Sequence, residues 1–216
     1  MQIYIWLTER LYNEFAWFYD TASWIVSLGH WNTWRSSAND LLKGTEILEI
    51  GFGTGELLIE MTKRNFHVFG IDSSQAMVNI TKKKLRRRNL ELPVIRGLIG
   101  QMPFKDHSFD TILSTFPADY IFDPATWREV ARLLQDNCRV LEKAGGQFVI
   151  IGLYVSYTGK LQFHRNHTKY DHACQDIFDR ITKLANSVDL SLRIETRIYS
   201  NHQLPILIAD RYNSLN

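Results

Sequence analysis

Short apolar runs alternate with amphipathic segments through most of the chain. The apolar runs have the length of buried strands and lie at residues 46–50, 66–72, 93–96, 109–113 and 147–153. Apolar side chains recur at helical spacing in the segments between and after them, at residues 54–64, 74–89, 123 to about 140, and 170–188. Strands that alternate with helices form a parallel sheet covered on both faces. The pattern therefore predicts a doubly wound α/β fold.

Two further strand-like segments, residues 190–199 and 204–209, end this pattern. The few residues between them are too short for a helical crossover, so we expect an antiparallel pair. Such a pair is commonly added at the edge of a parallel sheet. The predicted fold is α/β: a doubly wound, mostly parallel seven-stranded sheet with an antiparallel C-terminal hairpin and an N-terminal helical extension.

The extension, residues 8–40, reads as helical and is rich in aromatic side chains. Trp17, Trp24 and Trp31 recur every seven residues, so they share one face of a continuous helix, and a second apolar stripe accompanies them. One stripe can dock on the sheet. The other can cover a cofactor, meet a partner or contact a lipid interface. The alternative is that both stripes are core.

The chain has 216 residues, of which 45% are hydrophobic, and a formal net charge of +2. The length fits one domain, and the composition excludes a chain that is disordered throughout. We expect a single domain over residues 1–216, in which 1–42 form the helical extension or lid and 45–211 the cofactor-binding core. The small net charge gives no support to a nucleic-acid partner.

Several features bear on where the protein resides. Cys138 and Cys174 lack the spacing of metal ligands, so we predict no metal site and free thiols in a reducing compartment. No apolar stretch approaches the roughly 20 residues that span a bilayer. The first residues lack the basic start of a signal peptide. These features favour a soluble cytoplasmic protein.

Residues 82–88, KKKLRRR, are the densest run of charge. They fall in the last turns of a predicted helix, where the helix dipole favours cations. One interpretation is a solvated helix end. The other is weak peripheral contact with the inner face of a membrane, since attraction to anionic lipid is worth ~1 kcal/mol for each basic residue near the surface.

The most informative pattern is a glycine-rich turn directly after the first strand. Gly51, Gly53 and Gly55 alternate with other residues, and a predicted helix follows. A ligand can approach a glycine backbone closely because no Cβ intervenes. The second strand ends in Asp72, and a carboxylate there can accept hydrogen bonds from ribose hydroxyls. The turn and the carboxylate together predict an adenosine-type cofactor, although a dinucleotide site would have the spacing G-x-G-x-x-G.

Three segments resemble motifs of the class I S-adenosylmethionine-dependent methyltransferases. Residues 48–55 (LEIGFGTG) resemble the first motif, residues 69–77 (FGIDSSQAM) the second, and residues 102–110 (MPFKDHSFD) the stretch before the fourth strand. The terminal hairpin also fits this family. Residues 15–20 (FAWFYD) resemble a segment that precedes the domain in ubiquinone/menaquinone-type and phospholipid N-methyltransferases. The resemblance implies S-adenosylmethionine as cofactor and S-adenosylhomocysteine as product.

The resemblance also implies where the cofactor is bound. Gly51 and Gly53 would line its methionine part, Glu49 would lie near its amino group, and Asp72 would hold the ribose hydroxyls. Around the adenine and the sulfonium, the expected contacts are Ser73, Met77, Ile99, Gly100, Gln101, Ser114, Thr115 and Phe116. Gly55 completes the turn, and Tyr19 of the extension would approach the cofactor. Taken alone, Met77 reads as core.

One position departs from the family pattern. Many members carry Asp where this chain has Leu98, and that Asp accepts a hydrogen bond from the adenine amino group. Leucine has no acceptor. Adenine recognition would then depend on the backbone of Ile99 and Gly100, or on Gln101.

The methyl acceptor and any catalytic base are less constrained. After the fourth strand, Asp119 and Tyr120 are candidate polar groups that face the acceptor, or else belong to a surface loop. His164, with His167, lies after the fifth strand, where this fold often places substrate contacts; a loop histidine is also commonly just solvated. Asp110 reads as a residue that fixes the turn into the fourth strand.

The sequence therefore predicts a methyltransferase that acts on a small or lipid-like acceptor. The N-terminal resemblance suggests a phospholipid amine or a quinone-type ring. The Asn-Pro-Pro-Tyr motif of DNA and protein-glutamine methylating members is absent, which disfavours those substrates. Two alternatives are a nicotinamide-dependent oxidoreductase and a catalytically inert module that binds S-adenosylmethionine.

Overall fold

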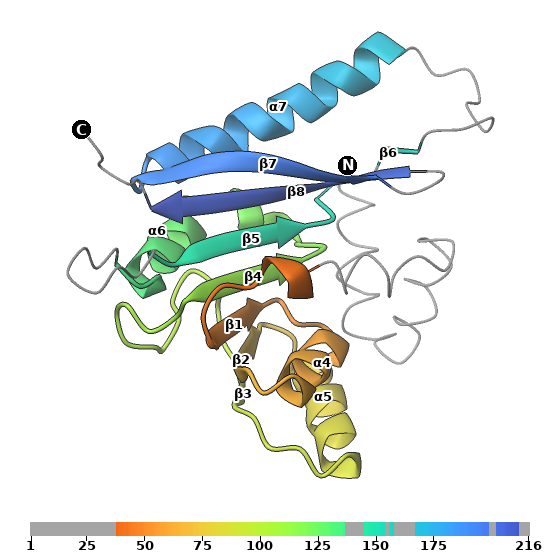
Figure 1. The fold of residues 1–216 in the computed structure, drawn as a ribbon, viewed down its shortest axis with the longest axis vertical. Helices are drawn as coiled ribbons and strands as arrows, with labels where there is room; N and C mark the ends of the chain where they lie inside the picture. Colours follow the sequence, from red (N-terminus) through yellow and green to blue (C-terminus); the bar gives the residue numbers. More distant parts are fainter. Residues whose placement is uncertain (1–37, 137–144, 154–155, 158–166, 199–201, 212–216) are drawn as a thin grey trace.

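The computed structural model describes residues 38–136, 145–153, 156–157, 167–198 and 202–211. Within them the strands are β1 Glu46–Ile50, β2 His67–Asp72, β3 Val94–Arg96, β4 Thr111–Thr115, β5 Gln147–Ile151, β6 Ser156–Tyr157, β7 Leu190–Ile198 and β8 His202–Arg211. The helices are α4 Glu56–Lys63, α5 Gln75–Arg87, α6 Pro124–Leu133 and α7 His167–Asn186, with the short 3-10 helices η1 Asn39–Leu41 and η2 Asp119–Phe122. Figure 1 shows their arrangement.

The described strands form one sheet in the order β3-β2-β1-β4-β5-β8. Strand β7 also pairs with β8, and the two-residue β6 pairs with the first two residues of β8, His202 and Gln203. Strands β3, β2, β1, β4 and β5 run parallel. Strand β8 is antiparallel to both β5 and β7. The doubly wound sheet and its antiparallel hairpin are thus confirmed, and β6 is a short addition that the sequence pattern did not predict.

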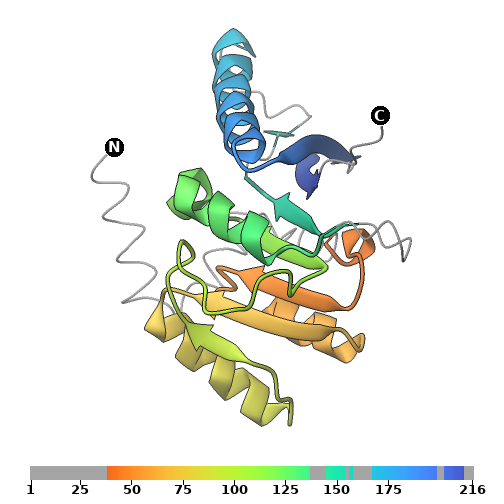
Figure 2. The same cartoon turned by 90° about the vertical axis from the view of Figure 1, so that its left-hand side faces the viewer.

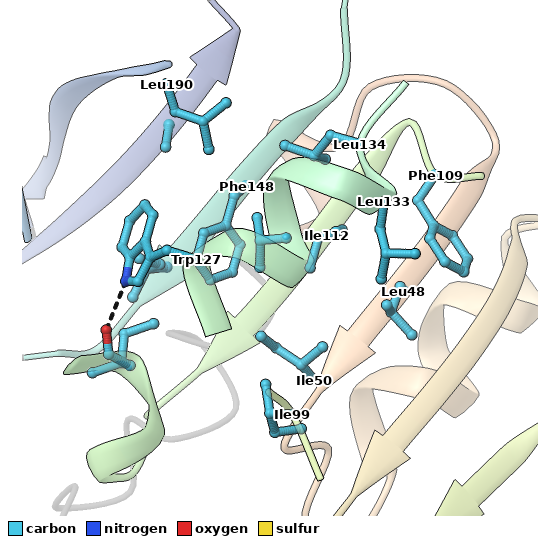
Figure 3. Packing of buried hydrophobic residues seen from close by; sticks show 14 of the residues in the cluster. Leu48, Ile50, Ile99, Phe109, Ile112, Trp127, Leu133, Leu134, Phe148 and Leu190 are labelled. Carbon is cyan, nitrogen blue, oxygen red and sulfur yellow. Dashed lines mark hydrogen bonds between the residues drawn. The ribbon is translucent and has the colours of Figure 1, made fainter. Parts of the chain in front are cut away.

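Helices cover both faces of the sheet (Figure 2). Because side chains alternate along a strand, Ile47 packs with α4 and α5, whereas Leu48 packs with α6 and α7. On the second face, Trp127 of α6 meets Phe148 of β5 edge-on, with ring centroids 5.4 Å apart. Its indole N–H donates to the carbonyl of Ile121 at 2.8 Å, which ties η2 to α6 (Figure 3).

Two of the predicted boundaries that differ from the structure have the same cause. Helix α6 ends at Leu133 instead of continuing toward residue 140, and β4 begins at Thr111 instead of residue 109. Leu134 turns to extended backbone and forms a bridge with Phe109, while Gln135 N–H donates to the Phe109 carbonyl at 2.9 Å. This long-range pairing replaces the next helical turn. Residues 137–144 lie outside the described part of the chain.

Asp110 lies at the start of β4, as expected, and also fixes the start of β1. Its Oδ2 accepts hydrogen bonds from the backbone N–H groups of Thr45 and Glu46, at 2.8 and 3.0 Å. Asp110 N–H donates in turn to the Glu46 carbonyl at 2.9 Å. The side chain therefore sets the relative register of β1 and β4, whose opposite ends carry the candidate site.

Candidate functional site

The carboxyl ends of β1, β2 and β4 meet in the middle of the sheet, because β1 lies between the other two. The glycine turn, residues 51–55, follows β1 here. Gly51, Gly53 and Gly55 all have positive φ, at +67°, +56° and +75°. Side chains disfavour this left-handed conformation, so the backbone itself favours glycine at these positions.

Two of these glycines are also required by their neighbours. A Cβ on Gly51 would overlap the hydroxyl of Tyr120, and a Cβ on Gly55 would overlap Thr81 of α5. The turn is therefore packed between α5 and η2. A side chain added at either position would force the neighbouring side chain, Tyr120 or Thr81, to shift.

Asp72 joins the glycine turn to the end of β2. It is buried, with 3% exposure. Its Oδ2 accepts from Gly53 N–H at 2.9 Å, and its Oδ1 accepts from Ser74 N–H at 2.8 Å. Burial raises the pKa of this carboxyl, although the two amide bonds oppose that shift. Each carboxylate oxygen can accept a further hydrogen bond, which is the chemistry that a pair of ribose hydroxyls requires.

The backbone of the turn discriminates between two kinds of ligand. Gly51 N–H donates to Ile71 O at 2.8 Å, and Gly55 N–H donates to Phe52 O at 3.1 Å. Since Gly53 N–H is held by Asp72, all three glycine N–H groups are used within the protein. A pyrophosphate site needs such groups aimed at the ligand. This turn instead suits a ligand that donates hydrogen bonds, as an ammonium group does.

The end of β4 brings further predicted residues to the turn. Ser114 is fully buried, and Thr115 Oγ1 donates to Glu49 Oε1 at 3.4 Å. The Glu49 carboxylate is itself buried, with 1% exposure. Phe116 has a positive φ of +51° and anchors its N–H on Ile151 O at 2.7 Å. The buried Glu49 and the partly exposed Thr115 thus form a polar pair beside the turn.

The hydroxyl of Tyr120 in η2 contacts both β1 and β4. It donates to the carbonyl of Ile50 at 3.1 Å and lies 2.7 Å from Ser114 Oγ. Both contacts are within the protein, so the hydroxyl holds η2 against the turn. We therefore expect Tyr120 to position the site, whereas the neighbouring Asp119 is exposed.

The residues expected at the adenine separate into two groups. Met77 is fully buried, which agrees with its interpretation as a core residue. Ser73, which precedes the N-cap Ser74 of α5, is exposed. After β3, Leu98 is 65% exposed, whereas the side chain of Ile99 points into the core (Figure 3). Ile99 could therefore contact a ligand through its backbone but not through its side chain.

Gly100 and Gln101 continue this segment after β3. A Cβ on Gly100 would lie 3.0 Å from that of Ala125, so the loop packs closely on α6. Gln101 is exposed. Tyr19 and His164 lie outside the described residues, and the side chain of His167, the first residue of α7, is likewise not described.

Sequence reasoning missed the side chains that hold these loops. Thr81 Oγ1 donates to the Gly53 carbonyl at 3.2 Å, and Arg96 Nε donates to the Ser73 carbonyl at 3.1 Å. Glu129 and Arg132 of α6 bind the segment after β3. Their spacing of three residues on a helix, with opposite charges, was the available signal. It indicated an ion pair but not the loop that the pair binds.

Two absences among the described residues bear on what this part of the chain can bind or cross. They contain no group of three or more His, Cys, Asp or Glu side chains placed to hold a metal ion. They also contain no helix long and apolar enough to cross a membrane.

Comparison with known proteins agrees with this geometry. Residues 47–145 match a family described as "Methyltransferase domain". A demethylmenaquinone methyltransferase of Tropheryma whipplei is 28% identical over 183 residues, which cover 83% of this chain and 70% of the relative. One of Thermotoga maritima is 30% identical over 161 residues, which cover 70% of this chain and 66% of the relative.

Solved structures share the fold at low sequence identity. The chain superposes with a TM-score of 0.59 on geranyl diphosphate C-methyltransferase of Streptomyces coelicolor, in complex with S-adenosylhomocysteine, with 12% identity. That match covers 84% of this chain and 77% of the other. Phosphoethanolamine N-methyltransferase 2 of Haemonchus contortus gives a TM-score of 0.60 with 13% identity, covering 85% of this chain and 53% of the other.

The order of the strands, the glycine turn and these relatives define the class of protein. The chain belongs to the class I S-adenosylmethionine-dependent methyltransferases, and S-adenosylmethionine is its cofactor. Its fold and relatives favour methyl transfer over the nicotinamide-dependent alternative, in agreement with the occupied glycine N–H groups.

Proposed function

We propose that the protein transfers a methyl group to a carbon of a quinone-type ring. One observation carries the choice of acceptor. The similarity to the Tropheryma whipplei demethylmenaquinone methyltransferase covers 83% of the chain, whereas the methyltransferase domain match spans only residues 47–145. The similarity therefore extends beyond residues 47–145 to most of the chain.

The cofactor site of this proposal rests on the described contacts. S-adenosylmethionine supplies an electrophilic methyl group on a sulfonium. Asp72 would accept both ribose hydroxyls, and the carbonyls of Gly51 and Gly53 would accept from the ammonium group. The buried Glu49 carboxylate, beside Thr115, adds a negative charge that favours this cationic end. Residues 1–42, of which 1–37 lie outside the described part of the chain, would form a lid over the same edge.

The acceptor needs one proton removed. A ring carbon of a quinol becomes nucleophilic when an adjacent hydroxyl is deprotonated, so a positioned base assists the transfer. Among the described candidates, Asp119 is exposed at the carboxyl edge and would take this proton on its carboxylate. Tyr120 would keep η2 in place through Ile50 and Ser114. His164 is the further candidate, outside the described residues.

We also infer weak contact with the inner face of a membrane, where a lipid-soluble quinone resides. The basic run, residues 82–88, supports this in part. Lys84 and Arg88 pair with Glu56 at 2.9 and 3.3 Å. The side chains of Lys82, Lys83, Arg86 and Arg87 are exposed and available to anionic lipid. Co-sedimentation with anionic vesicles that is lost at high salt is expected, and no co-sedimentation at low salt would contradict it.

A methyl-transfer assay tests the acceptor. The full chain is incubated with methyl-labelled S-adenosylmethionine and either a reduced demethylated naphthoquinol or phosphatidylethanolamine vesicles. Label in the quinol, and its absence with Asp72→Ala, is the expected result. Label in the lipid amine alone would overturn the proposal. Cofactor binding without transfer to any acceptor would identify an inert binding module.

A further inference from the structure

The segment that follows β3, residues 97–106, has no helix or strand of its own, and its first part, residues 97–102, is held at both ends. Gly97 N–H donates to the Asp72 carbonyl at 3.0 Å, which fixes the first end to β2. The second end is Met102, whose side chain is buried in the core. Residues 98–101, expected at the adenine, lie between these two fixed points.

Two charged side chains of α6 fix the second end. Glu129 Oε2 accepts from Met102 N–H at 2.7 Å, and Arg132 Nη2 donates to the Met102 carbonyl at 2.9 Å. Both backbone polar groups of Met102 are therefore satisfied by side chains about 30 residues later in the sequence. Met102 cannot shift without breaking two charge-assisted hydrogen bonds.

Arg132 uses each of its five N–H donors. Nε and one Nη2 proton bind the two carboxylate oxygens of Glu129, both at 2.8 Å. The other Nη2 proton binds Met102 O. The Nη1 protons bind Phe104 O at 2.8 Å and Asp106 Oδ1 at 2.7 Å. A guanidinium with five acceptors has one orientation, so it fixes three points of the segment at once.

The charges of the pair support the same geometry. The Arg132 hydrogen bond is the main cause of a lowered pKa for Glu129, with burial opposing it and the Met102 amide adding to it. Glu129 and Asp106 raise the pKa of Arg132. Both groups are therefore fully charged near neutral pH, and the contacts do not depend on titration there.

We infer that Glu129 and Arg132 are positioning residues for the adenine end of the cofactor, a role that rests on the proposed cofactor site. Neither residue is expected to touch the cofactor. They hold the segment in the one arrangement that binds adenine. If the segment adopts that arrangement only a tenth of the time in a variant, apparent cofactor affinity falls roughly tenfold.

The test compares two ligands that differ in the adenine. S-adenosylhomocysteine carries the base, whereas S-ribosylhomocysteine keeps the ribose and amino acid parts but lacks it. Arg132→Lys keeps the charge and the stem but cannot supply five donors. Arg128→Lys is the matched control, since Arg128 is an exposed residue on the same helix. Glu129→Gln provides a second variant that preserves shape and removes charge.

Arg132→Lys and Glu129→Gln should each lower the affinity for S-adenosylhomocysteine by about tenfold. The affinity for S-ribosylhomocysteine should stay unchanged. The KM for S-adenosylmethionine should rise while kcat at saturation stays the same, and Arg128→Lys should have neither effect. Equal weakening of both ligands, or no weakening, would overturn the inference. A wild-type chain that binds neither ligand would refute the cofactor site itself, which separates the two failures.

Discussion

Two loops at the carboxyl edge of the sheet are built in contrasting ways. The glycine turn, residues 51–55, is shaped by its own backbone and by Asp72 at the end of the adjacent strand. The segment after β3, residues 97–106, takes its shape from side chains of α6 that are distant in the sequence. The shape of the glycine turn depends on residue types that a sequence motif can detect. The shape of the segment after β3 depends on contacts that only the folded chain creates.

The largest effect is expected where the glycine turn is most constrained. Gly51→Ala places a methyl group against the Tyr120 hydroxyl and leaves a side chain at φ +67°. We expect a loss of ~2–4 kcal/mol in the free energy of unfolding, from backbone strain plus overpacking, together with loss of S-adenosylhomocysteine binding. Urea denaturation and calorimetry measure both.

A second change separates the two causes. Tyr120→Phe removes the overlapping hydroxyl but not the backbone strain, and it also removes the contacts to Ile50 and Ser114. Gly51→Ala should therefore cost less stability in a Tyr120→Phe background than in the wild type. Wild-type stability and affinity in Gly51→Ala itself would show that the backbone of the turn is not what shapes this loop.

The next effect concerns the carboxylate that joins the turn to β2. Asp72→Ala leaves the amides of Gly53 and Ser74 without their acceptor and removes the expected ribose ligand. Affinity for S-adenosylhomocysteine should fall by ~1–3 kcal/mol. Calorimetry on the folded variant is the measurement. An unchanged dissociation constant would remove Asp72 from the site.

The same carboxylate predicts a pH dependence. Burial raises the Asp72 pKa, and only the ionised form accepts both ribose hydroxyls. Affinity should therefore be complete above the raised pKa and fall about tenfold per pH unit below it. The contribution of Asp72 to the stability of the free protein runs the opposite way, rising as pH falls, because its folded pKa exceeds its unfolded pKa. Asp72→Asn should reduce the pH dependence of both the affinity and the stability. A wild-type affinity that does not change with pH would contradict the assignment of Asp72 as the ribose ligand.

The smallest effect belongs to the second loop. Leu98 offers no side-chain acceptor, and it is 65% exposed. A purine analogue of S-adenosylhomocysteine that lacks the 6-amino group should bind within about threefold of the parent, since an exposed hydrogen bond contributes little net free energy. Competition binding measures the ratio. A loss well above tenfold would show that the backbone or Gln101 reads the amino group.

The contrast between the loops also explains what the sequence could predict. The alternation of strands and helices in a mostly parallel sheet, the terminal hairpin and the glycine turn follow from local patterns, and all were confirmed. Asp110 lies at the start of β4, as expected. The end of α6 was missed because the bridge from Leu134 to Phe109 joins distant segments, which helical spacing cannot reveal. Arg132 was missed for the same reason.

The site residues divide along this line as well. The turn glycines and Asp72 occur together, as their motif predicts, whereas Met77 and Ile99 prove to have core side chains. A hydrophobic residue next to a motif serves equally well for the ligand and for the interior. Its neighbours in space, and not its neighbours in sequence, decide between the two.

The backbone of Gly53 has a kinetic consequence. Asp72 holds its N–H and Thr81 holds its carbonyl, so the peptide is oriented by the fold before any cofactor arrives. Encounter with the ribose and methionine parts then needs no rearrangement of this turn. In stopped-flow experiments, a plateau of the observed association rate at high cofactor concentration would then report closure of the proposed lid and not a rearrangement of this turn.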